Sequence, residues 1–575
     1  MEHELNDTPA PSTTGMSTGN QTMVEPEETK PEASNTKSED VRATTSSTEP
    51  LSPKQDDDTK YISGFRLAAV IGSITMVVFI LLLDVSIIAT AIPKITSDFH
   101  SLDDVGWYAA AYQLASATLQ PLTGKFYTHF STKWVFVFFL FLFEIGSFIC
   151  GVSTSSIMFI IGRVVAGLGG SGLINGALTM VSGAVPVERR AFHTSLMMGI
   201  GQLGLISGPL LGGVFTQYTT WRWCFYINLP AGAIAACILV ALDIPDLTKK
   251  EKFGLALIRK VIPQLDLLGF ALLAPTSVMF LLALQLGGNE YEWGSACIVG
   301  LFFGSGVLAI IFVIRESRVG DKAMIPAKII TQRIAISSAV QGMFLFGTVT
   351  VASYYFPIYF QAVKGAGPAL SGVYLLPSIF SQLALVVSSG WLVSKLGYYL
   401  PWPIASGVLS SIGNGLVSTF SPTTETAKWV GYQILLGAGR GAGMQMAMIA
   451  IQTGLPGYHI PVAIAFQVFC QNMLGSILLV VASTIFNQSL ATELPKHAPS
   501  VTPEAASSAG GSAEAVRGLL PEGSPELEGL LLSFSNSVDH VFIMLAVCSI
   551  ASFVAAFFMG WTDTRKKKGP VKGAA

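Results

Sequence analysis

Long apolar stretches alternate with short polar segments along most of this chain, from about residue 67 to residue 561. A bilayer core of ~30 Å requires roughly 20 apolar residues per helix, and stretches of that length recur throughout. The pattern predicts an all-α polytopic membrane protein with fourteen spans. The predicted spans are 67–92, 105–126, 134–151, 157–177, 192–218, 223–242, 266–286, 295–314, 335–360, 369–393, 400–420, 428–452, 461–486 and 538–561.

Composition excludes a set of soluble domains. Apolar residues make up 51% of the 575 residues and charged residues only 12%, about half of the roughly 25% typical of a soluble domain. The predicted spans are also apolar on all sides, whereas helices at the surface of a soluble protein are amphipathic.

Basic residues are distributed unequally between the two sides of the predicted membrane. With an even number of spans both termini lie on one side, and that side holds most of the Lys and Arg residues. The opposite side holds only Lys94, Arg222, Lys364, Lys428, Lys496 and Arg517. Because positive loops stay in the cytoplasm, both termini are predicted to be cytoplasmic.

Three segments lie outside the predicted spans. Residues 1–62 are rich in Ser, Thr, Glu and Pro and predict a disordered cytoplasmic tail, while 562–575 form a basic one. Residues 487–537 predict a long, poorly ordered loop on the non-cytoplasmic side. This loop begins with a glycosylation sequon at Asn487.

The chain repeats itself. Gly124-Lys125 after the second span has a counterpart in Gly390-Trp391 after the tenth, and Arg163 of the fourth span aligns with Gln433 of the twelfth. These pairs predict two six-helix bundles, 63–243 and 335–561, with a linker at 244–334 that carries spans 7 and 8. Two such bundles with a site between them near the midplane are typical of transporters.

Five motifs resemble the 14-span drug:proton antiporter branch of the major facilitator superfamily, especially its fungal members. They are Leu83–Pro93, Gly124–Phe130, Arg163–Gly170, Gly204–Gly213 and Trp221–Pro230, and the resemblance covers about residues 65–561. The resemblance implies a major facilitator fold of two six-helix bundles plus two linking helices.

The resemblance further implies a proton-coupled exporter of small amphipathic compounds, such as drugs, antifungals or a self-made toxin. No Gly-x-x-x-x-Gly-Lys-Ser/Thr motif is present, so we expect a proton gradient to supply the energy, with no cofactor, no metal and no enzyme activity. We expect a monomer in the plasma membrane, with substrate, protons and lipid as its partners and no nucleic acid. A vacuolar location, a carrier for basic amino acids or iron chelates, and a non-transporting sensor are the alternatives.

The fifth span carries a predicted hinge. Gly204, Gly208 and Gly212 recur every four residues, which allows a neighbouring helix to approach to backbone contact. Pro209 removes a helical hydrogen bond beside them. The resemblance adds Gly213 to this antiporter motif.

Charged residues inside the spans are candidates for proton coupling, because ionisable groups are costly in a bilayer. Asp84 in the first span and Arg163 in the fourth are predicted partners, acting either in coupling or as a static packing pair. Glu144 in the third span is a second candidate proton carrier. Arg440 lies deeper in its span than Arg163 does, so the two halves differ chemically.

The segment after the second span is a predicted gating loop of Gly124, Lys125, Thr128 and Lys133. The superfamily normally has an Asp where this chain has Thr128, so the loop cannot offer that charge to a helix end. Positive-inside topology explains the basic residues equally well.

Scattered amide and phenol side chains predict an apolar substrate cavity with few fixed charges. The predicted cavity residues are Gln113, Gln120, Asn175, Gln202, Tyr354, Gln361, Gln445, Gln467 and Gln471.

Overall fold

The fold was analysed in a computed structural model that describes residues 61–101, 104–251, 253–288, 290–509, 513–521 and 523–565. The predicted tail at 1–62 falls almost entirely outside this part of the chain, as does most of the tail at 562–575. Every regular element of the described residues is helical, apart from two isolated β-bridges.

The first half of the chain forms seven helices, of which α6 and α7 together occupy one predicted span. Their bounds are α1 Gly64–Phe99, α2 Val105–His129, α3 Thr132–Val152, α4 Ser156–Ala184, α5 Val187–Tyr218, α6 Trp223–Tyr226 and α7 Asn228–Ala241.

Two long helices and several short ones follow the first half. They are α8 Leu255–Val261, η2 Ile262–Gln264, α9 Leu267–Leu286, α10 Ala296–Val319, η3 Gly320–Lys322 and α11 Ala327–Ile330.

The second half has more broken helices than the first. Its elements are α12 Arg333–Ile358, η4 Tyr359–Val363, α13 Pro368–Tyr374, α14 Leu376–Leu396, α15 Pro401–Val417, α16 Thr426–Gly443, α17 Met446–Gly454, α18 Ile460–His497, α19 Pro503–Ser508, α20 Ala513–Arg517 and α21 Pro525–Phe557.

Each of the fourteen predicted spans coincides with a helix or a broken helix. Twelve of the described helices are long and apolar enough to cross a membrane. The two remaining bundle helices, α2 and α15, fall outside that set, so the all-α membrane fold is confirmed while the number fourteen stays a prediction.

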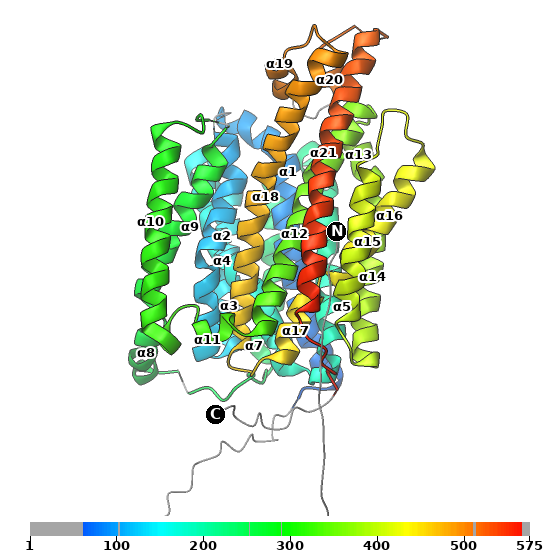
Figure 1. The fold of residues 1–575 in the computed structure, drawn as a ribbon. Coiled ribbons are helices and arrows are strands. Elements are labelled where there is room, and N and C mark those ends of the chain that lie inside the picture. Colours follow the sequence, from blue (N-terminus) through cyan, green and yellow to red (C-terminus); the bar gives the residue numbers. More distant parts are fainter. Residues whose placement is uncertain are drawn as a thin grey trace, which may run out of the picture. The chain divides into compact units, whose positions relative to one another are not determined.

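The same helix pairings occur in both halves (Figure 1). α1 packs on α5 and α4 packs on both α2 and α3, as α12 packs on α18 and α16 packs on both α14 and α15. The halves meet where α5 contacts α14 and where α2 contacts α18. The inserted helices α9 and α10 pack on each other, and α9 also packs on α2. This arrangement is the one expected of a six-helix unit used twice.

The segment 487–537 is not the poorly ordered loop that the sequence predicts. α18 continues to His497 and α21 begins at Pro525, and the two extensions are prominent in Figure 1. Leu490 and Leu494 pack with Leu527 and Phe534 in one buried cluster, which explains why these polar-flanked segments remain helical. Asn487 is exposed within α18, and its glycosylation stays a prediction.

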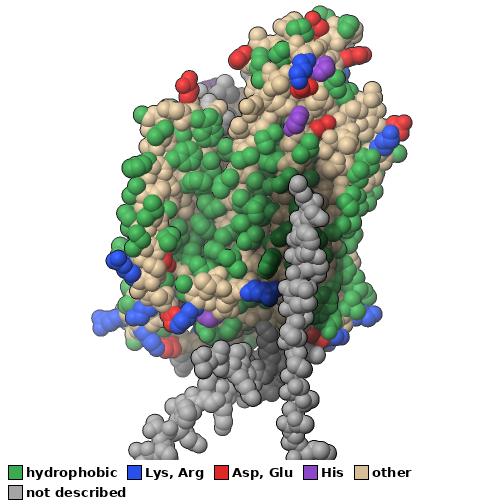
Figure 2. Space-filling view, in the orientation of Figure 1, with side chains coloured by type: hydrophobic (Ala, Val, Ile, Leu, Met, Phe, Trp, Pro, Cys, Tyr) green, Lys and Arg blue, Asp and Glu red, His purple; other side chains and the backbone are tan. Residues whose placement is uncertain are grey.

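The two ends of the helices differ in charge. Figure 2 shows Lys and Arg side chains gathered at one end and an apolar band above them. We call this end, which carries Lys133, Arg189, Arg315, Arg333 and Lys395, the basic end, and the opposite one the distal end. Exposed aromatic side chains such as Phe138 and Phe141, which are 57% and 62% exposed, are the surface expected to face lipid.

Candidate functional site

A buried ion pair lies in the first half, between α1 and α4. Arg163 Nη1 lies 2.7 Å from Asp84 Oδ2, and the two residues are 1% and 0% exposed. Arg163 Nε also donates to the Tyr108 carbonyl at 3.1 Å, and the guanidinium lies 4.5 Å from the centre of the Tyr112 ring. The structure therefore brings together the two residues that the sequence pairs, although their role in coupling stays a prediction.

Asn228, the first residue of α7, completes this site. Its Nδ2 donates to Asp84 Oδ1 at 3.1 Å and lies 3.2 Å from Ser147 Oγ of α3. Asn228 is fully buried. Sequence analysis placed it in the Trp221–Pro230 motif but gave it no role, because a motif alone does not show which helix its side chain meets.

Glu144 lies apart from the ion pair, one helical turn before Ser147 on α3. Both of its carboxyl oxygens are buried without a hydrogen-bond partner among the described residues. The carboxyl group packs against Gly232 of α7, where any side chain would collide with it. An ionised carboxylate without a partner is costly to bury, so this environment favours the neutral acid over the anion.

The glycine face of α5 packs directly against α1. A Cβ atom added at Gly208 would collide with Ser86 Oγ and lie 2.8 Å from the Ile87 nitrogen, and Gly204 and Gly212 make similar contacts. Gly213 has open space instead. Pro209 is exposed, and α5 runs unbroken across it. Close approach is thus confirmed for three glycines, and a hinge stays a prediction.

The predicted gating loop is mostly helical, which corrects the sequence interpretation. α2 continues to His129, so Gly124, Lys125 and Thr128 belong to its last two turns, and Lys133 lies in the first turn of α3. Thr128 Oγ1 bonds back to the Gly124 carbonyl at 2.7 Å, which is ordinary helical behaviour for a hydroxyl.

Three of these residues still face other elements. Gly124 touches α18, since a Cβ atom there would lie 2.8 Å from Val462 Cα. Lys133 Nζ donates to the carbonyls of Val240 and Leu242, both at 2.8 Å, which ties the start of α3 to the end of α7. Lys125 is buried and its Nζ approaches the Lys322 carbonyl at 3.4 Å.

A clamp formed by Asp246 and Lys250 supplies the charges that the α2–α3 connection itself lacks. Asp246 Oδ1 accepts a hydrogen bond from the Thr132 backbone N–H at 2.7 Å, at the first turn of α3. Lys250 Nζ donates to the carbonyls of Tyr127 and Thr128, at the last turn of α2. A negative charge at a helix N-terminus and a positive one at a C-terminus are both favourable.

Burial lowers the pKa of the Lys250 ammonium, and nearby Asp246 acts in the opposite direction. Sequence analysis missed the clamp, because contacts between residues more than a hundred positions apart leave no local signal.

The halves are locked together at the basic end. Arg190 Nη1 donates to the Gln452 carbonyl at 2.9 Å, and Gln452 Nε2 donates to the Leu178 carbonyl at 3.2 Å. Nearby, the Phe192 N–H donates to Ser394 Oγ at 3.0 Å. These contacts link α4 and α5 with α14 and α17.

Burial along α4 differs between its distal part and its basic part. In its distal part Ile157 and Ile161 are 71% and 52% exposed, whereas Gly169–Ala184 is buried except for Ile174. α16 and α17 follow the same pattern, with Ile434 46% exposed and Met446–Gln452 entirely buried. These three helices are therefore more tightly packed at the basic end than at the distal end.

The predicted cavity residues occupy three kinds of environment. Gln120, Asn175, Gln445 and Gln467 are buried; Gln202, Gln361 and Gln471 are half-buried; Gln113 and Tyr354 are exposed. Asn175 lies 2.9 Å from Thr123 Oγ1 in the tightly packed basic half, a position that favours packing over substrate contact. For the others, substrate contact stays a prediction.

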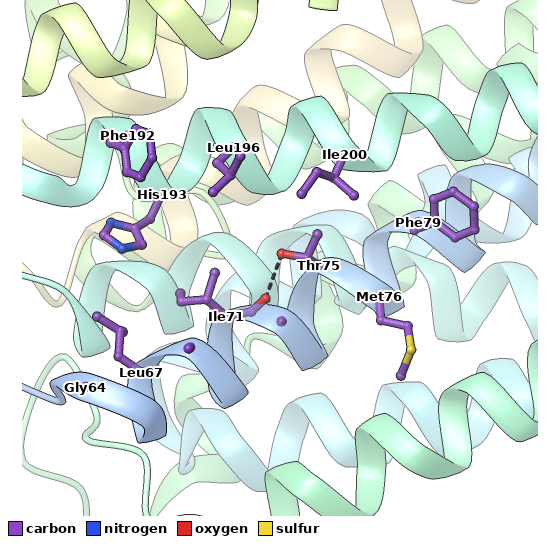
Figure 3. A pocket seen from close by; sticks show the side chains of 12 residues that line it. Gly64, Leu67, Ile71, Thr75, Met76, Phe79, Phe192, His193, Leu196 and Ile200 are labelled. Atoms are coloured by element: carbon purple, nitrogen blue, oxygen red, sulfur yellow. Dashed lines mark hydrogen bonds between the residues drawn. The ribbon is translucent and has the colours of Figure 1, made fainter.

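A groove that the sequence did not predict lies between α1 and α5 near the basic end (Figure 3). Its volume is about 680 Å³, and its lining is almost wholly apolar. Thr75, Phe192, His193 and Leu196 contribute to it, and the Thr75 hydroxyl is bonded to its own helix at 2.6 Å. The predicted coupling and cavity residues are absent from its lining.

Residues 74–480 match the Major Facilitator Superfamily. The chain belongs to this family. A curated relative described as "MFS-type transporter calB" from Penicillium decumbens is 57% identical over 90% of this chain and 92% of its own length. One described as "Efflux pump mlcE" from Penicillium citrinum is 47% identical over 89% and 93%. This membership confirms the predicted family and the expectation that the chain is a transporter rather than an enzyme.

Solved structures support the same fold. The proton:xylose symporter XylE bound to 6-bromo-6-deoxy-D-glucose matches with a TM-score of 0.55, covering 87% of this chain and 97% of that one. Sequence identity is 13%, so the match establishes the fold alone.

Proposed function

We propose that the protein is a proton-coupled exporter of small amphipathic organic compounds. The observations that support it are the buried Asp84–Arg163 pair and the contacts that join the two halves at the basic end, from which we infer a cavity that opens at the distal end. Relatives described as efflux pumps support the direction of transport. The positive-inside rule makes the basic end cytoplasmic, so the distal cavity faces away from the cytoplasm.

In this proposal the conformation described above is the one that releases substrate. The lock between Arg190 and Gln452 keeps the cytoplasmic side closed, and the clamp formed by Asp246 and Lys250 holds the α2–α3 connection against the linker. A proton then binds to Asp84 and weakens its attraction to Arg163, because the neutral acid loses the Coulomb term. That loss favours the conformation open to the cytoplasm, where Asp84 releases the proton and substrate binds.

Asn228 and Ser147 are positioning residues in this cycle. The hydrogen bond from Asn228 holds the Asp84 carboxyl group when its charge changes, and the contact of Asn228 with Ser147 links it to the α3 turn that follows Glu144. Glu144 is the alternative proton carrier, because its carboxyl group is buried in the same bundle.

A carrier for basic amino acids is less well supported by the site. Such a cation would need carboxylates of its own in the cavity, and Asp84 is already paired with Arg163. The chain has one acidic residue, Glu425, between Arg333 and Ala491. Apolar surroundings with few fixed charges suit amphipathic solutes better.

Transport by the purified full-length protein in proteoliposomes tests the proposal. An imposed proton gradient should drive accumulation of an amphipathic fluorescent dye, and a protonophore should abolish it. Accumulation that ignores the proton gradient, or that requires ATP, would contradict the proposed mechanism.

A further inference from the structure

Arg440 is a buried cation without a partner in the second half. It is 4% exposed, and its Nε and Nη2 have no hydrogen-bond partner among the described residues. An unpaired charge at this depth is costly, which makes an intramembrane ionisable residue a functional candidate.

Among the described residues no acidic side chain forms an ion pair with Arg440, and Asp539 of α21, a carboxylate in the same bundle, lies beside Phe420 and Tyr359 instead. Glu425 precedes the first turn of α16, far along the helix from Arg440, and Asp and Glu are otherwise absent from Arg333 to Thr492. The packing next to Arg440 is neutral: Gly439 abuts Ser410, Gly443 abuts Ser406, and Gly441 abuts the Gln382 carbonyl. The charge that balances Arg440 must therefore come from outside this part of the protein.

Arg440 also lies where a membrane helix is interrupted. α16 ends at Gly443 and α17 begins at Met446, so the break comes one turn after Arg440, in the part of the segment 426–454 nearer the basic end, and Met444 and Gln445 keep right-handed helical backbone angles. α4, the counterpart of α16 in the first half, runs from Ser156 to Ala184 without a break. Discontinuous helices near the bilayer midplane are a recurrent feature of substrate sites in transporters.

A purely structural role does not account for these facts. A cation in the last turn of α16 is favourable for the helix dipole. Side chains on a helix point toward its N-terminus, however, and Arg440 Nε and Nη2 bond none of the terminal carbonyl groups.

We propose that Arg440 binds the anionic group of the transported compound, so that the substrate class is an amphipathic organic acid. This inference rests on the proposed export function and narrows it. A carboxylate accepts two parallel hydrogen bonds from a guanidinium, which would satisfy the two free nitrogens together. Along α16, Gly431 and Ile434 are exposed on the distal side of Arg440.

Binding of a matched pair of probes tests the inference without requiring turnover. Pyrenebutyric acid and its methyl ester share one apolar skeleton and differ in charge. We expect wild-type protein in nanodiscs to bind the acid about tenfold or more tightly than the ester, with protein-free nanodiscs as the blank.

Arg440→Met should remove this preference and leave ester binding unchanged. Arg440→Lys should keep part of the preference for the acid, because lysine retains the charge but cannot donate two parallel hydrogen bonds to a carboxylate. Lys428→Gln removes an exposed cation from the start of the same helix and serves as the control, with an unchanged preference expected.

Protein stability separates this role from a structural one. If the charge has no partner in the protein, Arg440→Met should not lower the melting temperature, and the acid should raise that temperature in wild type only. If wild type binds the acid and the ester with equal affinity, the inference is overturned, even if Arg440→Met fails to fold. An Arg440→Met protein that still binds the acid more tightly than the ester would also overturn it.

Transport of the two probes separates this inference from the proposed function. Export of the ester with loss of acid export in Arg440→Met supports both. If that variant exports acid and ester equally, the proposed role of Arg440 is contradicted and the proposed export function is not. Failure of wild type to export either probe counts against the export proposal, while the binding preference still decides the role of Arg440.

Discussion

The two halves of this transporter share one helix arrangement but differ in how they treat a buried arginine. In the first half Arg163 is held by Asp84, the Tyr108 carbonyl and the Tyr112 ring. In the second half Arg440 is equally buried, yet two of its nitrogens bond to nothing among the described residues. The comparison indicates that one six-helix unit has been specialised for an internal charge balance and the other for a charge supplied from outside.

The packing of α5 on α1 gives the largest expected effect on transport. Gly208→Leu should abolish transport and lower the free energy of unfolding by about 3 kcal/mol, because overpacking separates two helices in backbone contact. Gly213→Leu is the matched control, since its Cβ position has open space. Transport assays and thermal denaturation of both variants measure the difference. Equal activity of the two would show that close packing of α5 on α1 is not required for transport.

Substituting each arginine in turn compares the stability contributed by a paired and an unpaired buried cation. Arg163→Met should destabilise the protein by about 3–5 kcal/mol, because Asp84 is left buried without its partner. Arg440→Met should cost far less. Thermal unfolding in one detergent or nanodisc preparation compares the two, and similar losses of stability would break the distinction between a paired and an unpaired cation.

The clamp at the basic end should have a smaller effect. Asp246→Ala removes a charged acceptor from the first turn of α3 and should cost about 1 kcal/mol. Hydrogen exchange of the α2–α3 connection should rise in this variant. Asp243→Ala, at an exposed position of the same linker, is the control, and matching exchange in both variants would show that the clamp does not hold the connection.

Glu144 should give the smallest effect. Its carboxyl oxygens bond to nothing among the described residues, so Glu144→Gln removes no hydrogen bond seen in the structure. We expect near-normal stability and only a minor loss of proton-driven transport, measured beside an Asp84 variant. Complete loss of proton coupling in Glu144→Gln would instead identify Glu144 of α3 as the proton carrier.

Sequence reasoning located the helices because the length of an apolar run is a property of the chain alone. It also paired Asp84 with Arg163, since two charges inside apolar spans have few partners to choose from. It failed where polar segments fold on one another. The extensions of α18 and α21 carry Leu490, Leu494, Leu527 and Leu530 at helical spacing, a signal that was present but lay outside the apolar windows.

The remaining misses depend on contacts that are distant along the chain. Asn228 meets Asp84, Asp246 meets Thr132, and Lys250 meets the end of α2 only once the helices have packed. The isolation of Arg440 is partly visible in the sequence, because acidic residues are nearly absent around it. Its burial and the break after it required the structure.

Asp84→Asn tests whether Asp84 carries the coupled proton, because it removes the titratable group and keeps the shape of the side chain. Proteoliposomes holding the variant should exchange substrate across the membrane, which shows that the protein is folded and binds. We expect them to fail to concentrate substrate when a proton gradient is imposed, whereas wild-type proteoliposomes succeed. Concentration by Asp84→Asn equal to that of wild type would contradict the assignment of proton coupling to the first half.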